Sequence, residues 1–405
     1  MFYGFWKMQE HGKNSLDNWA FNSGLNIGTT VSRQSLNERL NEKAVALGQS
    51  VLMKALNLKE QPKSRKISEK LMQKLTYFAR VLIRDSTVQQ VSNNLATAFP
   101  GSFSHGKATA LTRIQALYNF TDLKWEDFQI GAFTDNDQGA AGCIADFLKP
   151  KDLLLQDLGY FSLDWIEALI KEQYLITKWH PKTHLFTTNN VKIDLEEYLK
   201  GEKEVDIPVL VGAKHKILMR LVVRKLPKKV AKKRIESAKK DRHSKTNHDE
   251  TYYELLKYEI YLTNVDSAVL NAKEIAKLYG LRWYIEILFK SWKSYANFKK
   301  MFKKEKVQFH RVLFTIYALL IQFTYLTTVV YSFIQNEIRQ KSTKILSILK
   351  FMDKTNNIMS DILNIKTLSE LIKYVPAFMA HATYEKHSKR QNIIEKYLYI
   401  NDLCI

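Results

Sequence analysis

The sequence predicts an α/β protein with helical regions at both ends. Three observations support this fold class. Apolar residues recur at spacings of three and four through residues 1–128 and again from Ala272 onward, as in amphipathic helices. Short β-like runs are concentrated between about 174 and 264. We therefore expect a helical N-terminal region (1–128), a mixed core with a β-rich insertion (129–300) and a helical C-terminal region (301–405).

The N-terminal region is expected to contain several helices. Leu16–Gly24 and Thr29–Leu40 have the shape of two short helices joined by a glycine-containing turn, which fits either a DNA-binding helix-turn-helix or a plain helical hairpin. Further helices are expected at Ile67–Arg84, Val88–Ala98 and Ala108–Phe120.

The core begins with a change of pattern after Phe128. A helix is expected from Ala140 to Phe147, followed by an apolar run, Leu153-Leu154-Leu155-Gln156, that ends in Asp157. This pattern is typical of a buried strand that ends with a carboxylate at the edge of a sheet. A helix is expected at Leu163–Lys171. Further β-like runs follow it: Tyr174–Trp179, His184–Thr188, Ile207–Val211, Ile217–Val223 and Tyr258–Thr263.

Composition limits the class of partner. The chain has 405 residues, 62 Lys and Arg against 41 Asp and Glu, and a formal net charge of +21. Such a surplus draws a protein to polyanions through phosphate neutralisation and counterion release. Two cysteines, Cys143 and Cys404, are too few for a disulfide framework or a structural zinc site. A reducing cytoplasm is the simplest setting.

One segment of the C-terminal region has a composition that is also found in membrane-spanning helices. Val312–Ile334 carries no charged residue and is long enough to cross a bilayer. A helix buried in the core of a large α-rich protein has the same composition. We expect a buried core helix and no membrane association. Beyond it, Pro376 is expected to break a helix.

The most informative stretch is residues 279–293. On one continuous helix Tyr279, Arg282, Glu286 and Lys293 lie at offsets 0, 3, 7 and 14 and share one stripe. A solvated, salt-bridged helix face would have the same pattern. The chemistry favours a different interpretation, because a carboxylate can hold a divalent cation while Arg and Lys bind phosphate oxygens and Tyr hydrogen-bonds them.

This spacing resembles the Tyr-x2-Arg-x3-Glu-x6-Lys signature of bacterial DDE transposases of insertion-sequence family four. A second motif of that family, an Asp at a strand end followed by x-Gly-Tyr, is matched by Asp157-Leu158-Gly159-Tyr160, with Leu158 where the family often has Arg. A β-rich insertion between this Asp and the Glu is expected from the resemblance, and residues 174–264 fit it. The resemblance covers roughly residues 60 to 300.

The resemblance implies a ribonuclease-H-like core in which three acids hold two Mg²⁺ ions, with Mn²⁺ as a possible substitute, for in-line phosphodiester cleavage and strand transfer. Asp157 and Glu286 would be the second and third acids, and Tyr279, Arg282 and Lys293 would bind DNA phosphates. The implied partners are double-stranded DNA, as transposon ends and target, and a second copy in a homodimer on paired ends. A bacterial, nucleoid-associated protein of the cytoplasm is expected.

The first acid is not found in this interpretation. The family carries it as Asp-Gly/Ser-Thr in the first core strand, and that strand is expected shortly after Phe128, where no β run occurs. The first core strands are therefore expected to be missing. Two hypotheses follow. The chain is either an internally deleted, catalytically inactive remnant that only binds DNA, or an enzyme in which Asp135 or Asp137 replaces the first acid. A turn or helix-cap role is the alternative for these two residues.

The basic segment Arg224–Lys245 is a further candidate for DNA contact. About half of its residues are Lys or Arg, and Glu236 and Asp241 are its acids. It is interpreted as an arm that follows DNA phosphates, with a solvated loop or helix as the alternative.

Overall fold

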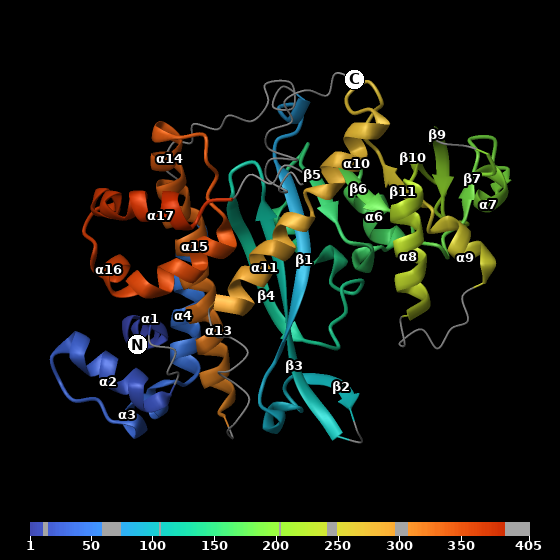
Figure 1. Cartoon of the computed structure of the whole chain (residues 1–405). Coiled ribbons are helices and arrows are strands. Elements are labelled where there is room, and N and C mark those ends of the chain that lie inside the picture. The colour runs from blue at the N-terminus through green and yellow to red at the C-terminus, as the bar shows by residue number, and fades with distance from the viewer. Residues whose placement is uncertain are drawn as a thin grey trace. The chain divides into compact units, whose positions relative to one another are not determined.

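A computed structural model describes residues 1–10, 15–58, 74–104, 107–201, 204–240, 249–295 and 307–384 (Figure 1). These residues divide into two compact units. The first unit takes in residues 1–58, 85–135 and 283–384, and the second takes in residues 74–84 and 136–282. Strand β1 (Val81–Gln90) belongs to both, because its first four residues lie in the second unit and the remaining six in the first.

The first unit begins with four helices, of which the second and third confirm the two short helices expected there. Ser15, Ser32 and Asn41 each cap the N-terminus of a helix with a side-chain oxygen. Gly28 ends one of them at φ +68°, a conformation that favours glycine. A DNA-binding role for the pair remains a prediction. The four helices are α1 (Phe2–Glu10), α2 (Leu16–Ile27), α3 (Arg33–Arg39) and α4 (Glu42–Leu56).

The C-terminal part of the first unit is also helical, as expected. Pro376 lies in the first turn of α17, directly after a 3₁₀ segment, so it marks a helix boundary as predicted. The elements are α11 (Trp283–Tyr295), α13 (Phe309–Thr324), the π-helical turn η4 (Tyr325–Val330), α14 (Tyr331–Lys341), α15 (Ile348–Thr355), η5 (Asn356–Ile358), α16 (Met359–Asn364), η6 (Leu368–Tyr374) and α17 (Val375–His381).

The strands of the first unit overturn the prediction for residues 81–128. β2 (Pro100–Ser104) and β4 (Lys124–Ala132) each pair antiparallel with β3 (Lys107–Asn119). β1 is the neighbour of β3 on the side away from β4, and the short 3₁₀ turn η1 (Asn93–Leu95) lies between β1 and β2. The helices predicted at Val88–Ala98 and Ala108–Phe120 are wrong. The end of the helix predicted at Ile67–Arg84 is also wrong, because Val81–Arg84 belongs to β1. Residues 67–73 of that predicted helix lie outside the described part of the chain.

The physical reason is burial on both faces. From Ile114 to Phe120 every residue of this stretch is buried, so the period-2 alternation that would identify a half-exposed strand is absent. The ground for expecting the first core strands to be missing is therefore wrong, because strands lie before Ala132 at positions where helices were expected.

The second unit confirms the strands predicted between Leu153 and Thr263. Its sheet runs in the order β1-β5-β6-β11-β10-β9-β7-β8, with β1, β5 and β6 parallel and the other pairs antiparallel. The β-rich insertion thus continues the sheet from β6. The strands are β5 (Leu153–Gln156), β6 (Tyr174–Lys178), β7 (Leu185–Phe186), β8 (Lys192–Ile193), β9 (Glu204–Val211), β10 (Ile217–Lys225) and β11 (Tyr258–Thr263).

Helices connect these strands. The helix expected at Ala140–Phe147 is a 3₁₀ helix, and the one expected at Leu163–Lys171 is α6. The basic segment forms α8 over its described residues, while 241–245 lie outside them. The helical elements are η2 (Ala141–Phe147), η3 (Leu158–Tyr160), α6 (Leu163–Leu169), α7 (Leu195–Tyr198), α8 (Lys228–Lys240), α9 (Glu250–Leu255) and α10 (Ala272–Gly280).

One helix in the described part of the chain, Phe309–Lys341, is long and apolar enough to cross a membrane, and 78% of its most apolar window is buried inside the protein. Its contacts are those of a core helix. Trp6 Nε1 donates to the carbonyl of Ala318 at 2.9 Å, and Trp125 Nε1 donates to Thr327 Oγ1 at 3.1 Å. The burial agrees with the predicted core helix.

Candidate active site at the ends of the parallel strands

Asp157 lies directly after β5, where the carboxyl ends of parallel strands meet. Leu155 of β5 is paired in register with Ile176 of β6. Counting two residues onward on each strand brings Asp157 level with Lys178, the last residue of β6. Lys178 in turn is in register with Tyr261 of β11. The end of the sheet in the second unit therefore has a carboxylate, an ammonium and a phenol in one row.

The local contacts of Asp157 leave its carboxylate partly exposed. It is the N-cap of η3 and accepts from the backbone N–H of Gly159 at 3.5 Å. Its Oδ1 lies 3.5 Å from Nε of Arg282, and 43% of its side chain is exposed, against 15% for Arg282. The predicted pair of second acid and phosphate-binding arginine is thus found side by side.

The ring of Tyr279 lies near two cations of this site, Lys178 and Arg282. Its ring centroid is 5.7 Å from Lys178 Nζ and 5.9 Å from Arg282 Cζ, and its ring meets that of Tyr261 at 5.2 Å. Sequence reasoning singled out Tyr279 and Arg282 but missed Lys178 and Tyr261, because only the strand register brings these two residues to the same row.

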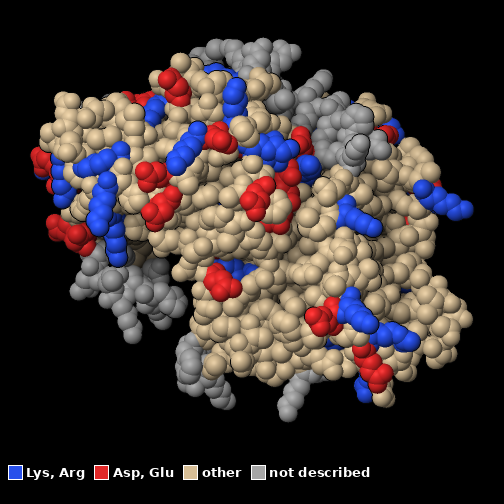
Figure 2. Space-filling model, turned by 180° about the vertical axis from the view of Figure 1, so that it is seen from behind, with Lys and Arg blue, Asp and Glu red and all other residues tan. Residues whose placement is uncertain are grey.

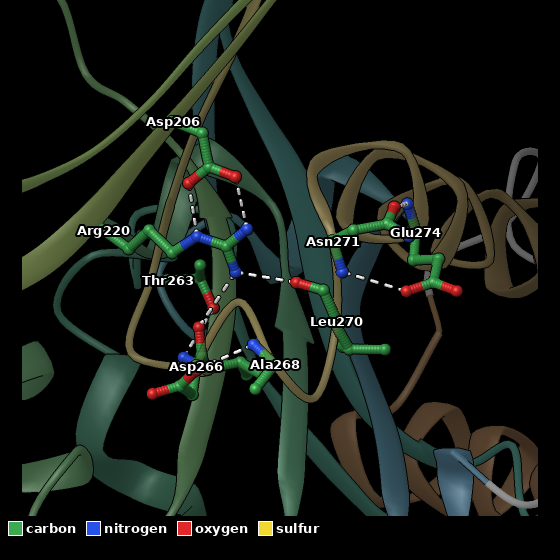
Figure 3. Close-up of polar contacts among 9 residues, drawn as sticks. Asp206, Arg220, Thr263, Asp266, Ala268, Leu270, Asn271 and Glu274 are labelled. Atoms are coloured by element: carbon green, nitrogen blue, oxygen red, sulfur yellow. Dashed lines mark hydrogen bonds and ion pairs between the residues drawn. The ribbon is translucent and has the colours of Figure 1, made fainter.

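Helix α10, which carries Tyr279, is held in place by a polar network at its N-terminus (Figure 3). Arg220 of β10 binds both carboxylate oxygens of Asp206 at 2.5 Å and donates to the carbonyl of Leu270 at 2.7 Å. The next residue, Asn271, forms a reciprocal capping box with Glu274. Lys74 Nζ also forms an ion pair with the carboxylate of Glu274, at 2.6 Å. The helix therefore begins at a fixed point on the sheet.

The signature stretch is not one continuous helix, and this corrects the predicted single stripe. α10 ends at Gly280 and α11 begins at Trp283, so Tyr279 lies on the first helix, Arg282 in the break, and Glu286 and Lys293 on the second helix. The break coincides with the boundary of the two units. Spacing alone did not reveal it, because helix-compatible residues run through it.

Glu286 and Lys293 lie in the first unit, on one side of α11, and both are half-buried. The helix is held by aromatic contacts: the Tyr284 ring lies 5.6 Å from Tyr118 of β3, and Trp292 stacks with Phe323 of α13 at 5.7 Å. The predicted packing residues Ile285, Leu288, Phe289 and Trp292 are all buried. This packing fixes the side of α11 on which Glu286 lies.

Asp85 is the carboxylate that sequence reasoning missed. It follows Arg84, which is in register with Gln156, the residue before Asp157. It stands in Asp85-Ser86-Thr87 within β1 and is half-buried, and its Oδ1 accepts from the backbone N–H of Ser86 at 2.8 Å. The signal was the Asp-Ser-Thr motif itself, which was passed over because the surrounding residues were assigned to helices.

The two suggested substitutes for the first acid differ in their surroundings. Asp135 accepts from the backbone N–H of Ala132 at 2.8 Å, which is the turn role given as its alternative. Asp137 lies so close to Gly159 that a Cβ there would be 3.1 Å from its carboxylate oxygen. Gly159 therefore permits the close approach of this loop to the turn after Asp157.

The donor set suits a hard divalent cation, since the candidate ligands are carboxylates within β1, directly after β5 and in the first turn of α11. Within the described residues no three His, Cys, Asp or Glu side chains are grouped closely enough to hold a metal ion. The present partner of Asp157 is Arg282. A cation bound by Asp157 would compete with that guanidinium.

A mixed α/β chain with an acid directly after a parallel strand and a guanidinium beside it is compatible with a protein that acts on phosphodiesters. The comparison with known proteins defines the class. Residues 76–321 match the family described as the transposase DDE domain, which is more than half of the chain. The chain belongs to this family, and its function class is that of an insertion-sequence transposase.

Several relatives are similar at the level of the sequence. The transposase for insertion sequence element IS231B of Bacillus thuringiensis subsp. berliner is 28% identical over 75% of this chain and 68% of that protein. The IS231F transposase of B. thuringiensis subsp. israelensis is 29% identical over 70% and 63%. The IS1151 transposase of Clostridium perfringens is 27% identical over 75% and 67%. The chain thus matches about two thirds of the length of these relatives.

A solved structure of the piggyBac transposase synaptic complex with hairpin DNA is similar over 78% of this chain and 60% of that chain, with a TM-score of 0.39 and 11% identity. A similarity this weak carries no argument about fold or function.

Proposed function

We propose that the chain cuts and joins DNA at transposon ends through a ribonuclease-H-like core. The observation that carries this proposal is the position of Asp85, one residue beyond the pairing of Arg84 with Gln156, which precedes Asp157. The strand order β4-β3-β1-β5-β6, with β1, β5 and β6 parallel, supports the ribonuclease-H-like assignment. This proposal takes β1 as the first core strand, so it does not require the internal deletion that the alternative hypothesis assumes.

In this proposal Asp85, Asp157 and Glu286 are the three metal-binding acids, and Mg²⁺ or Mn²⁺ is the cofactor. When bound, the ions would supply an activated oxygen nucleophile and stabilise the leaving oxygen. Tyr279, Arg282 and Lys293 would hold phosphates of the DNA. Arg282 suits this role because it lies 3.5 Å from the Asp157 carboxylate and a guanidinium can present a fork of donors to a phosphate.

Double-stranded DNA is the proposed partner, and the exposed lysines of α8 are proposed to follow its backbone. The helix has seven Lys or Arg and one Glu in 13 residues. The face shown in Figure 2 has basic side chains mixed with acidic ones, so the surplus of +21 is not concentrated there. We further propose a homodimer on paired ends that works on the nucleoid in the bacterial cytoplasm.

The test is cleavage of a labelled duplex that carries the terminal repeat of the element encoding the chain, with Mg²⁺ or Mn²⁺. We expect cleavage by the wild-type protein, and a loss of at least about a thousandfold in Asp85→Asn and in Glu286→Gln, because each variant removes a carboxylate charge from the metal site. DNA affinity of both variants should stay within a few-fold of wild type.

Asp135→Asn is the matched control, since its carboxylate has a turn role and should be dispensable for chemistry. Full cleavage by Asp85→Asn together with loss of cleavage in Asp137→Asn would show that Asp137, and not Asp85, is the first acid. Binding of the terminal repeat without any cleavage by the wild-type protein would support the rival function, a remnant that only binds DNA.

A further inference from the structure

Lys178 is a largely buried cation that forms no ion pair with the described carboxylates near it. It ends β6 and is only partly exposed. Burial lowers the pKa of Lys178, and the neighbouring guanidinium groups of Arg234 and Arg282 lower it further, while the carboxylates of Glu259 and Asp157 oppose that shift. Within the described part of the chain its ammonium has no ion pair or hydrogen bond, and it faces the ring of Tyr279, whose centroid is 5.7 Å from Nζ.

The carboxylates near Lys178 already have other partners. Glu259 binds Arg234 at 3.2 Å, and Asp157 lies 3.5 Å from Arg282. Both carboxylates are therefore engaged by guanidinium groups, and neither forms an ion pair with Lys178. A largely buried ammonium is costly unless an anion compensates it, so the cluster as it stands favours the entry of one further negative group.

The position of Lys178 indicates which anion. By strand register it stands level with Asp157, and Tyr279 lies within 6 Å of both Lys178 Nζ and Arg282 Cζ. An anion at this place would be within reach of an ammonium, a guanidinium and a phenol, which are the donors that proteins use for phosphates. A carboxylate ligand would satisfy the charge but would not explain its place beside an acid proposed to act on phosphodiesters.

We propose that Lys178 binds a backbone phosphate of the DNA strand held at Asp157, together with Arg282 and Tyr279. This inference rests on the proposed function and adds a residue to the site. Lys178 then has a double effect: the phosphate gives its ammonium a direct ion-pair partner, and Lys178 offsets the repulsion between the phosphate and the Asp157 carboxylate.

The experiment is a methylphosphonate scan of the terminal-repeat duplex, in which one phosphate at a time is made neutral, with binding and cleavage measured for wild type and Lys178→Met. Neutralising the contacted phosphate should weaken wild-type binding by about ten- to a hundredfold, as expected for a charged hydrogen bond. Lys178→Met should bind the unmodified duplex as weakly, and should show no additional weakening at that position, since the pair is already broken.

Two further variants separate charge from folding. Lys178→Arg keeps the charge and should restore most of the affinity. Lys216→Met is the matched control, because Lys216 also lies over an aromatic ring, that of Phe186, but in the turn between β9 and β10. Lys178→Met should be at least as stable as wild type, because a buried charge is removed at nearly constant side-chain length.

The inference is overturned if Lys178→Met retains wild-type affinity and shows the wild-type methylphosphonate pattern. Cleavage gives a separate result for the proposed function: its absence in the wild-type protein would reject the enzyme, whereas the binding scan would still decide the role of Lys178. Wild-type cleavage with an unaltered Lys178→Met scan would reject Lys178 alone.

Discussion

Arg84 shows how a single buried residue can hold the end of β1 in place. Its side chain is 0% exposed, and its guanidinium donates to the carbonyls of Ala140 and Ala141 and stacks on the Tyr160 ring at 4.3 Å. Burial lowers the pKa of Arg84, while Tyr160 and two other neighbours oppose the shift. The residue before Asp85 is thereby tied to the turn that follows Asp157.

Replacing Arg84 with Met is expected to lower the free energy of unfolding by about 1–3 kcal/mol, because two buried carbonyls lose their donor. Urea denaturation measures this change. Arg84→Lys keeps the charge but cannot reach both carbonyls as a fork, so it should fall between Met and wild type. A Met variant as stable as wild type would show that the cost of burying the guanidinium equals what its hydrogen bonds contribute.

At the scale of residues, motifs of charged side chains were predictable and their neighbours were not. Asp157, Tyr279 and Arg282 were found from spacing, and the structure brings them together in one unit. Lys178 was missed because its position beside Asp157 depends on the register between β5 and β6, and the sequence of a single strand does not determine that register. Asp85 lies in an Asp-Ser-Thr motif, but it was missed because the stretches on both sides of this motif were wrongly predicted to be helices.

That wrong assignment belongs to the scale of elements. Strands covered on both faces have continuous apolar runs, and apolar residues at spacings of three and four occur in such runs as readily as in helices. The half-exposed or short strands of the second unit, such as β6 and β10, were recognised. The buried stretch Ile114–Asn119 of β3 was not, because burial on both faces removes the alternation of apolar and polar residues that identifies a strand.

Helix α8 provides the prediction at this scale. It buries Ala231 and exposes Lys228, Lys229, Lys232 and Lys233, for which no ion pair exists among the described residues. If these lysines follow a duplex backbone, changing all four to Gln should reduce the slope of log affinity against log salt by about 0.9 for each DNA phosphate that the variant no longer neutralises. Fluorescence anisotropy between low and moderate salt measures the slope.

A set of four exposed lysines from the C-terminal helices and their connections serves as the control: Lys341, Lys354, Lys366 and Lys373. Their change to Gln removes the same net charge from the chain. An equal reduction of the slope in both sets would mean that only the overall +21 matters, and α8 would then be a solvated helix without a specific role.

At the scale of the whole chain, the composition of the long apolar helix Phe309–Lys341 fits either a membrane span or a core helix, and its burial inside the protein favours the core helix. Some of its polar residues form hydrogen bonds inside the protein, as when Thr327 Oγ1 donates to the carbonyl of Phe323 at 2.7 Å. Gln322 Nε2 likewise reaches the sulfur of Met359 at 3.6 Å. Thr and Gln at these positions are what a packed helical core uses, since each can bond a neighbouring backbone or side chain.

The stability of the whole protein offers a test of the metal site that is independent of catalysis. A ligand that binds only the folded state stabilises it by RT ln(1 + [L]/Kd), which is about 2.7 kcal/mol at a hundredfold excess over Kd. Thermal unfolding of the wild-type chain should therefore shift upward with Mn²⁺ or Mg²⁺. Asp85→Asn, Asp157→Asn and Glu286→Gln should each lose most of that shift, because each removes one ligand.

Asp164→Asn is the control, since 92% of the Asp164 side chain is exposed and its change should leave the metal-dependent shift intact. Asn at position 157 preserves the oxygen that caps η3, so an altered baseline stability is not expected there. If all three acid variants gained as much from the metal as the wild-type chain, the ions would be bound elsewhere. The assignment of Asp85, Asp157 and Glu286 would then fall even where cleavage is lost.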